Sequence, residues 1–271
     1  MTGRRAIVCY VEDNRHLVQQ LLALRLSLLH AGSSDTDLVK IPQRPAVEDP
    51  VWQDYRFVNS AACLNGAGAE QLDRYPHLLR TDVDTFVTPP WHDFRPEAFT
   101  CGHGTYSHND DVRQRIRAIA VQYGLAHRGL TNVGSTWYGP TEVVRRTGAF
   151  TGMLTTHLLT QHFATDHGTW PGWFRGVALL YASEIAVNHC APDAQLSGLL
   201  DAMSSSQESP SRFAHIHCWH SDLRFSKHAF MGGRYTAEDA QNLNPDAVAD
   251  YCLALSFQSL IALEDWLATR E

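Results

Sequence analysis

The strongest constraint on the fold is a continuous apolar run, Ala6 to Val11, followed directly by polar residues and then by a helical pattern. An uninterrupted run of this kind is typical of a strand that is buried on both faces of a mostly parallel sheet. The following helix is expected to reach about His30, because leucines recur on one stripe and Asp13 or Asn14 can cap its first turn. Strand, polar turn and helix together predict an α/β fold with a central, mostly parallel sheet flanked by helices.

The end of this first strand is a candidate for ligand binding. Ligands of open α/β sheets bind beyond the carboxyl ends of the strands. Tyr10 and Val11 therefore lie at one expected edge of a nucleotide pocket. A plain strand end followed by a helix cap explains the same residues, and both interpretations stay open.

A pair of aspartates follows a second buried strand, in the sequence YPHLLRTDVDTFVTPP. In an extended chain the side chains of Asp82 and Asp84 point to the same side, while Val83 turns back to the core. Two adjacent carboxylates repel one another and lose hydration unless a cation lies between them. Carboxylate oxygens suit Mg²⁺ or Mn²⁺, which keep open positions for substrate phosphates. The pair is predicted to hold a divalent metal ion, although solvated loop carboxylates produce the same short pattern.

A glycine-rich segment, Gly129 to Pro140, is another candidate for ligand binding. It combines glycines and hydroxyl side chains with two large aromatic residues, which suits a loop whose backbone approaches a ligand closely. We expect Gly134, Ser135 and Trp137 to contact the nucleotide. The alternative is a turn-rich connector with a packed tryptophan, and the pattern does not separate the two.

One acid, Glu184, interrupts the apolar helix expected from Val177 to Val187. Burial raises the pKa of a carboxyl group that has no partner, which suits a general base. A structural acid bonded to backbone amides or to an arginine is an equally good explanation.

Histidines gather on a late strand. In RFAHIHCWHSDLRFSKH, apolar residues alternate with His215 and His217, which is the period of a strand with one apolar face. His220 follows just past the strand end, and Lys227 comes later in the same segment. Imidazole is a common metal ligand, and lysine can balance phosphate charge. His217 and His220 are therefore predicted metal ligands, and Lys227 is predicted to contact the phosphates of a nucleotide.

Composition excludes several other classes of protein. A net charge of −7 leaves no basic surface for nucleic acid, and no apolar run is long enough to span a membrane. The six cysteines form no C-x-x-C pair, which argues against a disulfide framework. We expect a cytoplasmic protein of one domain, residues 1–271, with a nucleotide-binding half at about 1–90 and an acceptor-side half at about 91–271. No pattern specifies an oligomeric state.

The order of these motifs resembles the layout of nucleotide-sugar-dependent glycosyltransferases of the GT-A type. More closely, the blocks LLRTDVDTFVTP, HRGLTNVGSTWYGP, ASEIAVNH and IHCWHSDLRFSK resemble a poorly characterised glycosyltransferase-like family, and this similarity extends from Ala6 to about Ser226. The resemblance implies a GT-A-like, Rossmann-type domain in which Asp82 and Asp84 hold the metal or the donor ribose. The late block lacks the H-x-x-G-x-x-K-P-W form of the best-known retaining families, so the choice between His217 and His220 stays open, as does the stereochemistry.

The main hypothesis is a metal-dependent glycosyltransferase that moves a sugar from a nucleoside diphosphate sugar to an acceptor hydroxyl or amine. A cation is needed because negative charge develops on the leaving diphosphate. Asp84 is then essential, and Glu184 either deprotonates the acceptor in an inverting reaction or positions the sugar in a retaining one. The alternatives are a metal-dependent hydrolase built on the Asp pair and the His cluster, and a non-catalytic protein that binds a sugar or nucleotide.

Overall fold

The structure, a computed structural model, describes residues 4–41, 50–219 and 224–268 of the 271-residue chain. The chain forms two compact units, each assembled from several stretches. Unit 1 comprises Met1–Tyr10, Val39–Thr81 and Pro96–Ser197, and unit 2 comprises Val11–Leu38, Asp82–Arg95 and Gly198–Glu271. The organisation of the chain as one domain with a nucleotide half and an acceptor half stays a prediction.

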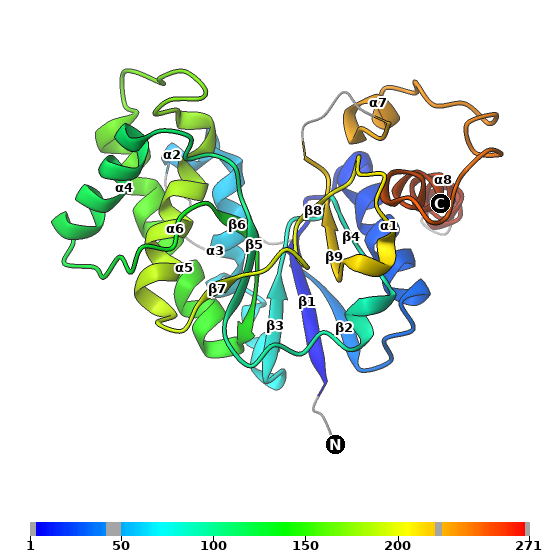
Figure 1. Ribbon diagram of the computed structural model, residues 1–271, viewed down its shortest axis with the longest axis horizontal. Helices are drawn as coiled ribbons and strands as arrows, with labels where there is room; N and C mark the ends of the chain where they lie inside the picture. The colour runs from blue at the N-terminus through cyan, green and yellow to red at the C-terminus, as the bar shows by residue number, and fades with distance from the viewer. Residues whose placement is uncertain (1–3, 42–49, 220–223, 269–271) are drawn as a thin grey trace. The chain divides into compact units, whose positions relative to one another are not determined.

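The central sheet has six strands in the order β2-β1-β3-β6-β5-β7 (Figure 1). Its strands are β1 (Arg5–Tyr10), β2 (Thr36–Ile41), β3 (His77–Arg80), β5 (Thr100–His103), β6 (Val133–Pro140) and β7 (Gln195–Leu196). β1 pairs with β3 and β5 pairs with β7 in parallel, whereas β6 runs antiparallel to both of its neighbours. β1, β3, β5 and β7 therefore share one direction, which confirms a mixed α/β fold with a mostly parallel central sheet.

The helices of unit 1 flank this sheet. They are α2 (Pro50–Gln53), α3 (Asn59–Ala62), α4 (Asp110–Gln122), α5 (Thr141–His157) and α6 (Ala178–Cys190), with short 3-10 turns η1 (Arg56–Val58), η2 (Cys63–Asn65), η3 (Ala69–Arg74) and η6 (Arg175–Val177) and a π-helical turn η5 (Leu158–His162). α5 and α6 pack against one another and against β6. The apolar sequence of α6 fits this position, because almost all of its residues are buried. Residues 56–62 could form a strand by their sequence alone, but η1 and α3 occupy them.

Unit 2 is built on a second sheet of three short strands in the order β4-β9-β8. Its elements are α1 (Arg15–His30), β4 (Thr85–Val87), η4 (Pro89–His92), β8 (Ala202–Met203), η7 (Pro210–Arg212), β9 (His215–His217), α7 (Lys227–Met231) and α8 (Val248–Ala268). α1 packs against both α8 and β4. Hydrogen bonds also join α1 to both elements. The Gln19 side chain donates to the Ser259 hydroxyl of α8 at 2.9 Å, and the Val87 amide of β4 donates to the Ser27 hydroxyl at 2.9 Å.

The predicted cap of the first helix is confirmed. The side chain of Asn14 accepts a hydrogen bond from the His16 amide at 2.9 Å at the start of α1. Asn109 caps α4 in the same way through the Val112 amide. The last helix, α8, begins at Val248. Among the described helices, none is both long enough and apolar enough to cross a membrane.

Candidate metal centre

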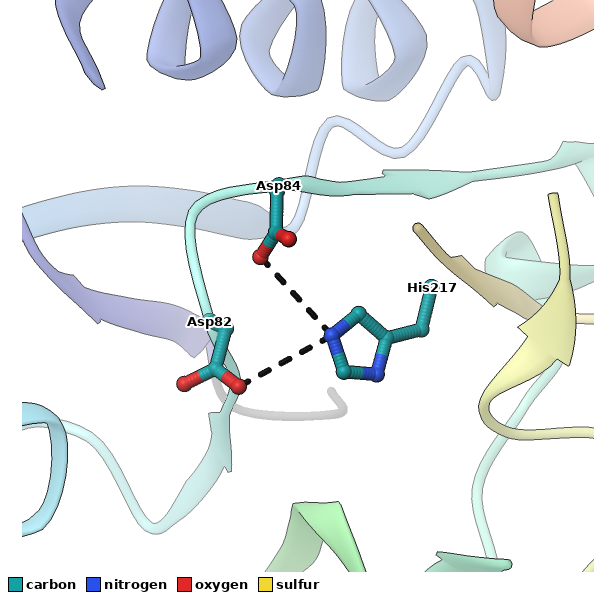
Figure 2. A group of neighbouring side chains, drawn as sticks. All are labelled: Asp82, Asp84 and His217. Carbon is teal, nitrogen blue, oxygen red and sulfur yellow. Dashed lines mark ion pairs between the residues drawn. The ribbon is translucent and has the colours of Figure 1, made fainter. Parts of the chain in front are cut away.

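Asp82, Asp84 and His217 converge within unit 2. Nε2 of His217 lies 3.8 Å from Oδ2 of Asp82 and 3.7 Å from Oδ1 of Asp84. Figure 2 shows the two aspartates on the connection that leads into β4, with the imidazole pointing at both. All three side chains are partly accessible, so an ion can reach them.

The pairing of β4 with β9 explains why these residues meet. The two strands run antiparallel with Thr85 opposite His217, and the Cys218 amide donates to the carbonyl of Asp84 at 3.0 Å. The chain passes from β3 into Asp82 and Asp84 and then enters β4. Between the two aspartates, Val83 is buried, as the spacing predicts. A local i, i+2 pattern thus supplies two carboxylates, and strand pairing adds the imidazole.

The donor set fits a divalent cation. One ligand atom from each of the three residues lies within 4.8 Å of the others. Two bonds of about 2.1 Å to one ion place the ligand atoms at most about 4.2 Å apart, and both measured His-to-carboxylate separations fall inside this limit. Two carboxylates with one imidazole suit Mn²⁺ or another borderline-hard divalent ion.

Lys227, the first residue of α7, donates a hydrogen bond to Oδ2 of Asp84. Burial by itself raises the pKa of Asp84, but the neighbouring Lys227 and His217 more than reverse this and hold that pKa below its ordinary value. The pKa of Lys227 is lowered by burial and then raised above its ordinary value by Asp84. Both groups are therefore charged at neutral pH.

The surroundings of this ion pair are mostly apolar. Asp84 and Lys227 line a small pocket whose other walls include Ala23, Phe86 and Phe230. Charges attract more strongly next to apolar walls than in water, and an unpaired charge is correspondingly more costly there. The pair is thus held tightly while no other cation occupies the carboxylate.

A third carboxylate, Asp201, belongs to the same cluster and was not predicted from the sequence. Its Oδ1 lies 3.7 Å from Nδ1 of His217, and its side chain is 1% exposed. Asp201, Asp82 and Asp84 carry three formal negative charges against the one positive charge of Lys227. The remaining two charges are what a divalent ion would neutralise. In the sequence, Asp201 stands between Leu200 and Ala202 without any motif around it, so no sequence signal marks it.

Glu184 lies in unit 1, buried within α6, and both of its carboxylate oxygens contact neighbouring polar groups. It accepts hydrogen bonds from the Tyr106 hydroxyl at 2.8 Å and the Asn132 amide at 2.7 Å, and Nε2 of His127 lies 3.3 Å away. Its side chain is 1% exposed. These contacts favour the structural interpretation of this acid, and its role as a catalytic residue stays a prediction.

The second half of the glycine-rich segment, Val133–Pro140, forms strand β6 instead of the expected ligand-binding loop. Gly134, Ser135 and Trp137 lie in the buried strand β6. The Trp137 ring is fully buried beneath the Arg80 guanidinium, 4.9 Å from its centre, and its indole N–H donates to the carbonyl of Gly134. The alternative of a packed tryptophan describes this geometry, and the expected nucleotide contacts of the three residues stay untested.

The other predicted residues lie as follows. Tyr10 ends β1 in unit 1 and is half-buried, with its hydroxyl 3.4 Å from the Asn59 amide nitrogen. Val11 follows it in unit 2 and is 1% exposed. His220 lies outside the described residues, so of the two proposed histidine ligands only His217 is placed in the cluster.

Comparison with solved structures finds glycosyltransferases at low similarity. A glycosyltransferase involved in glycosylation of the major capsid of PBCV-1 is 10% identical, with 81% of this chain and 95% of that chain covered at a TM-score of 0.45. The bifunctional glycosyltransferase WbbM is 9% identical over 94% of this chain and 50% of that one, with a TM-score of 0.41. Mouse xyloside xylosyltransferase 1 is 11% identical over 74% and 87%, with a TM-score of 0.33.

Comparison with protein-family models gives a match over most of the chain. No curated protein matches the chain. One family model, described as a domain of unknown function (DUF7164), matches residues 4–262 and so includes both units and every residue of the metal cluster. The chain therefore belongs to the DUF7164 family.

Proposed function

We propose that this chain is a metal-dependent glycosyltransferase that transfers a sugar from a nucleoside diphosphate sugar to an acceptor hydroxyl or amine. The observation that carries the proposal is the convergence of Asp82, Asp84 and His217 on one point, with the Lys227 ammonium beside them. Carboxylates and imidazole bind the cation, and an ammonium beside them suits an anionic partner such as a diphosphate.

The chemistry explains why both kinds of group are needed. Negative charge develops on the leaving diphosphate as the bond to the sugar breaks, and a bound divalent ion stabilises that charge. Asp82, Asp84 and His217 hold the ion at the site. Lys227 leaves Asp84 when the cation arrives and turns its ammonium to the phosphate oxygens. Tyr10 and Val11 are retained as proposed contacts of the nucleotide.

The test is a thermal-shift screen of nucleoside diphosphates and their sugars, with and without Mn²⁺. A ligand that binds only the folded state raises the melting temperature by mass action. The proposal expects one nucleotide to raise the melting temperature only when Mn²⁺ is present, and expects Asp84→Asn to lose that shift. Glu142→Gln is the matched control, because Glu142 is an exposed acid of unit 1 that contacts only Arg146 among the described residues.

Other outcomes identify the alternatives. A shift with Mn²⁺ alone and none with any nucleotide would overturn the transferase in favour of a metal-dependent hydrolase. A nucleotide shift that is independent of Mn²⁺ and survives Asp84→Asn would instead indicate a binding protein without metal chemistry. With the nucleotide known, release of the diphosphate from its sugar, measured with and without added acceptors, tests turnover directly.

A further inference from the structure

His217 presents its two ring nitrogens to two different sets of carboxylates. Nε2 faces Asp82 and Asp84, whereas Nδ1 faces Oδ1 of Asp201 at 3.7 Å. A neutral imidazole carries one proton, so one nitrogen donates and the other offers a lone pair. A metal ligand must offer its lone pair to the ion, which requires the proton to sit on the other nitrogen. Asp201 lies where a proton on Nδ1 would find its acceptor.

His215 is a second imidazole beside the same carboxylate, with its Nδ1 3.5 Å from Oδ1 of Asp201. Its Nδ1 accepts a hydrogen bond from the backbone amide of Asp201 at 3.3 Å, so the proton of the neutral ring is on Nε2. An Nδ1 that accepts the bond from this backbone amide carries no proton, so His215 donates none to the Asp201 carboxylate from that nitrogen. Nδ1 of His217, 3.7 Å from the same oxygen, is then the ring nitrogen that can donate to this carboxylate.

The backbone around Asp201 is built to aim its side chain. Asp201 has a φ of 56°, in the left-handed region that residues other than glycine seldom adopt. The next residues form β8, which pairs in parallel with β9 so that Ala202 lies opposite Ile216 and Met203 opposite His217. The carbonyl of Leu199 accepts from the His215 amide at 3.1 Å on the other side of Asp201. Bonds on both sides thus fix the turn that places Asp201 beside the imidazoles.

We propose that Asp201 is a positioning residue of the metal centre, which holds His217 with its proton on Nδ1 and its Nε2 lone pair directed at the site of the cation. The proposal rests on the proposed function only in assuming that Asp82, Asp84 and His217 bind a divalent cation. Carboxylates that orient metal-binding histidines in this way typically change metal affinity about 10- to 100-fold when they are altered.

The first test needs no metal and no variant of Asp201. ¹⁵N NMR of the histidine rings reports which nitrogen carries the proton. Spectra recorded at about pH 9, above the ordinary imidazole pKa of about 6.5, show the neutral rings. His217→Gln identifies the His217 signals among the 15 histidines. We expect His217 to carry its proton on Nδ1, and a proton on Nε2 would overturn the proposal.

The second test is Asp201→Asn. Asparagine has nearly the same shape as aspartate and also tolerates a positive φ. An amide can donate to Nδ1, so the proton of His217 is expected to move to Nε2 and Mn²⁺ affinity to fall about 10- to 100-fold by calorimetry. Asp250→Asn is the control, because Asp250 is also a buried acid of unit 2 but bonds to Arg224 and Asn244 instead of to a histidine.

These readouts separate the possible failures. If the unaltered protein binds no divalent cation, the proposed function fails, while the ring-proton measurement still tests the contact between Asp201 and His217. If the unaltered protein binds Mn²⁺ and Asp201→Asn binds it equally well with the proton still on Nδ1, the positioning role is refuted. A purely structural role would lower the melting temperature in both Asn variants without moving the His217 proton.

Discussion

Lys227 donates a hydrogen bond to Asp84 across 143 residues of sequence, and the two groups carry opposite charges inside the predicted metal centre. The ammonium neutralises the same carboxylate that a divalent ion would bind. Lys227 is bonded to Oδ2, whereas Oδ1 of the same carboxylate faces His217, and the proposed function has the arriving ion displace the ammonium. The competition has consequences that can be measured without knowing the substrate.

Removal of the ammonium should strengthen metal binding. In Lys227→Met the Asp84 carboxylate has no competing cation, and the methionine stem still fills the apolar pocket. We expect Mn²⁺ affinity to rise by about tenfold, which corresponds to about 1.4 kcal/mol. Isothermal titration calorimetry measures this, with Lys40→Met as the control because Lys40 is exposed on β2. Unchanged or weaker Mn²⁺ binding in Lys227→Met would show that the two cations do not compete.

Displacement of Lys227 can also be followed directly. The chain has only two lysines, Lys40 and Lys227, so reductive methylation with ¹³C labels few sites and gives a simple spectrum. Addition of Mg²⁺ should shift the methyl signal of Lys227 and leave that of Lys40 in place, since only the former loses its carboxylate partner. A spectrum in which both signals stay fixed, at a Mg²⁺ concentration that calorimetry shows to be saturating, would contradict displacement.

Glu184→Gln should act on stability and not on metal binding. The carbonyl oxygen of a glutamine can replace Oε2, which accepts from both the Tyr106 hydroxyl and the Asn132 amide, but its NH2 group then takes the place of the charged oxygen that faces His127. Loss of a buried charged acceptor costs about 1–3 kcal/mol. Urea denaturation should show this decrease, with Glu142→Gln as the exposed control and Mn²⁺ affinity equal in all three proteins. A variant of full stability that has lost only turnover would restore the catalytic interpretation.

The ion pair of Asp250 with Arg224 predicts a dependence of stability on pH. Burial raises the pKa of Asp250, but the hydrogen bond from Arg224, 2.7 Å long, lowers it below the ordinary value. A carboxyl whose pKa is lower in the folded state stabilises the fold above its unfolded pKa of about 3.9, and this stabilisation disappears as the pH falls through the folded pKa. The free energy of unfolding of Asp250→Asn, from urea titrations, should lie below that of the parent by a constant amount above about pH 5. A difference that persists undiminished at about pH 2 would contradict this account.

The parts of the site that the sequence predicted are those set by local geometry. Asp82 and Asp84 follow a buried strand with one residue between them, so an extended chain already brings their carboxylates together. His217 was recognised because apolar residues alternate with histidines around it, which marks a strand. Both patterns need only a few neighbouring residues. His217 reaches Asp84 only because β4 pairs with β9, and the sequence did not specify this pairing.

The errors arise where distant contacts decide the outcome. Glycines in β6 suggested a loop, yet Gly139 is needed because a Cβ there would lie 2.5 Å from the Phe99 ring. Arg56 to Ala62 could form a strand by its sequence but is helical, since short apolar segments fit either structure until their packing partners are known. Asp201 gave no periodic signal at all, because its position depends on a single left-handed residue before β8.

Glu184 and Asn188 occupy successive turns of α6 and hold the segment at 126–132 against it. The Asn188 side-chain carbonyl accepts from the amides of Arg128 and Leu130, while Glu184 accepts from Asn132. The blocks HRGLTNVGSTWYGP and ASEIAVNH are thus joined by one buried network. In related chains, replacement of the acid at 184 should be accompanied by changes at 106 or 127, whose side chains contact it. Such covariation would show that these two blocks are retained for folding. The blocks that contain Asp82, Asp84 and His217 would then be the part of the family signature that is retained for metal binding.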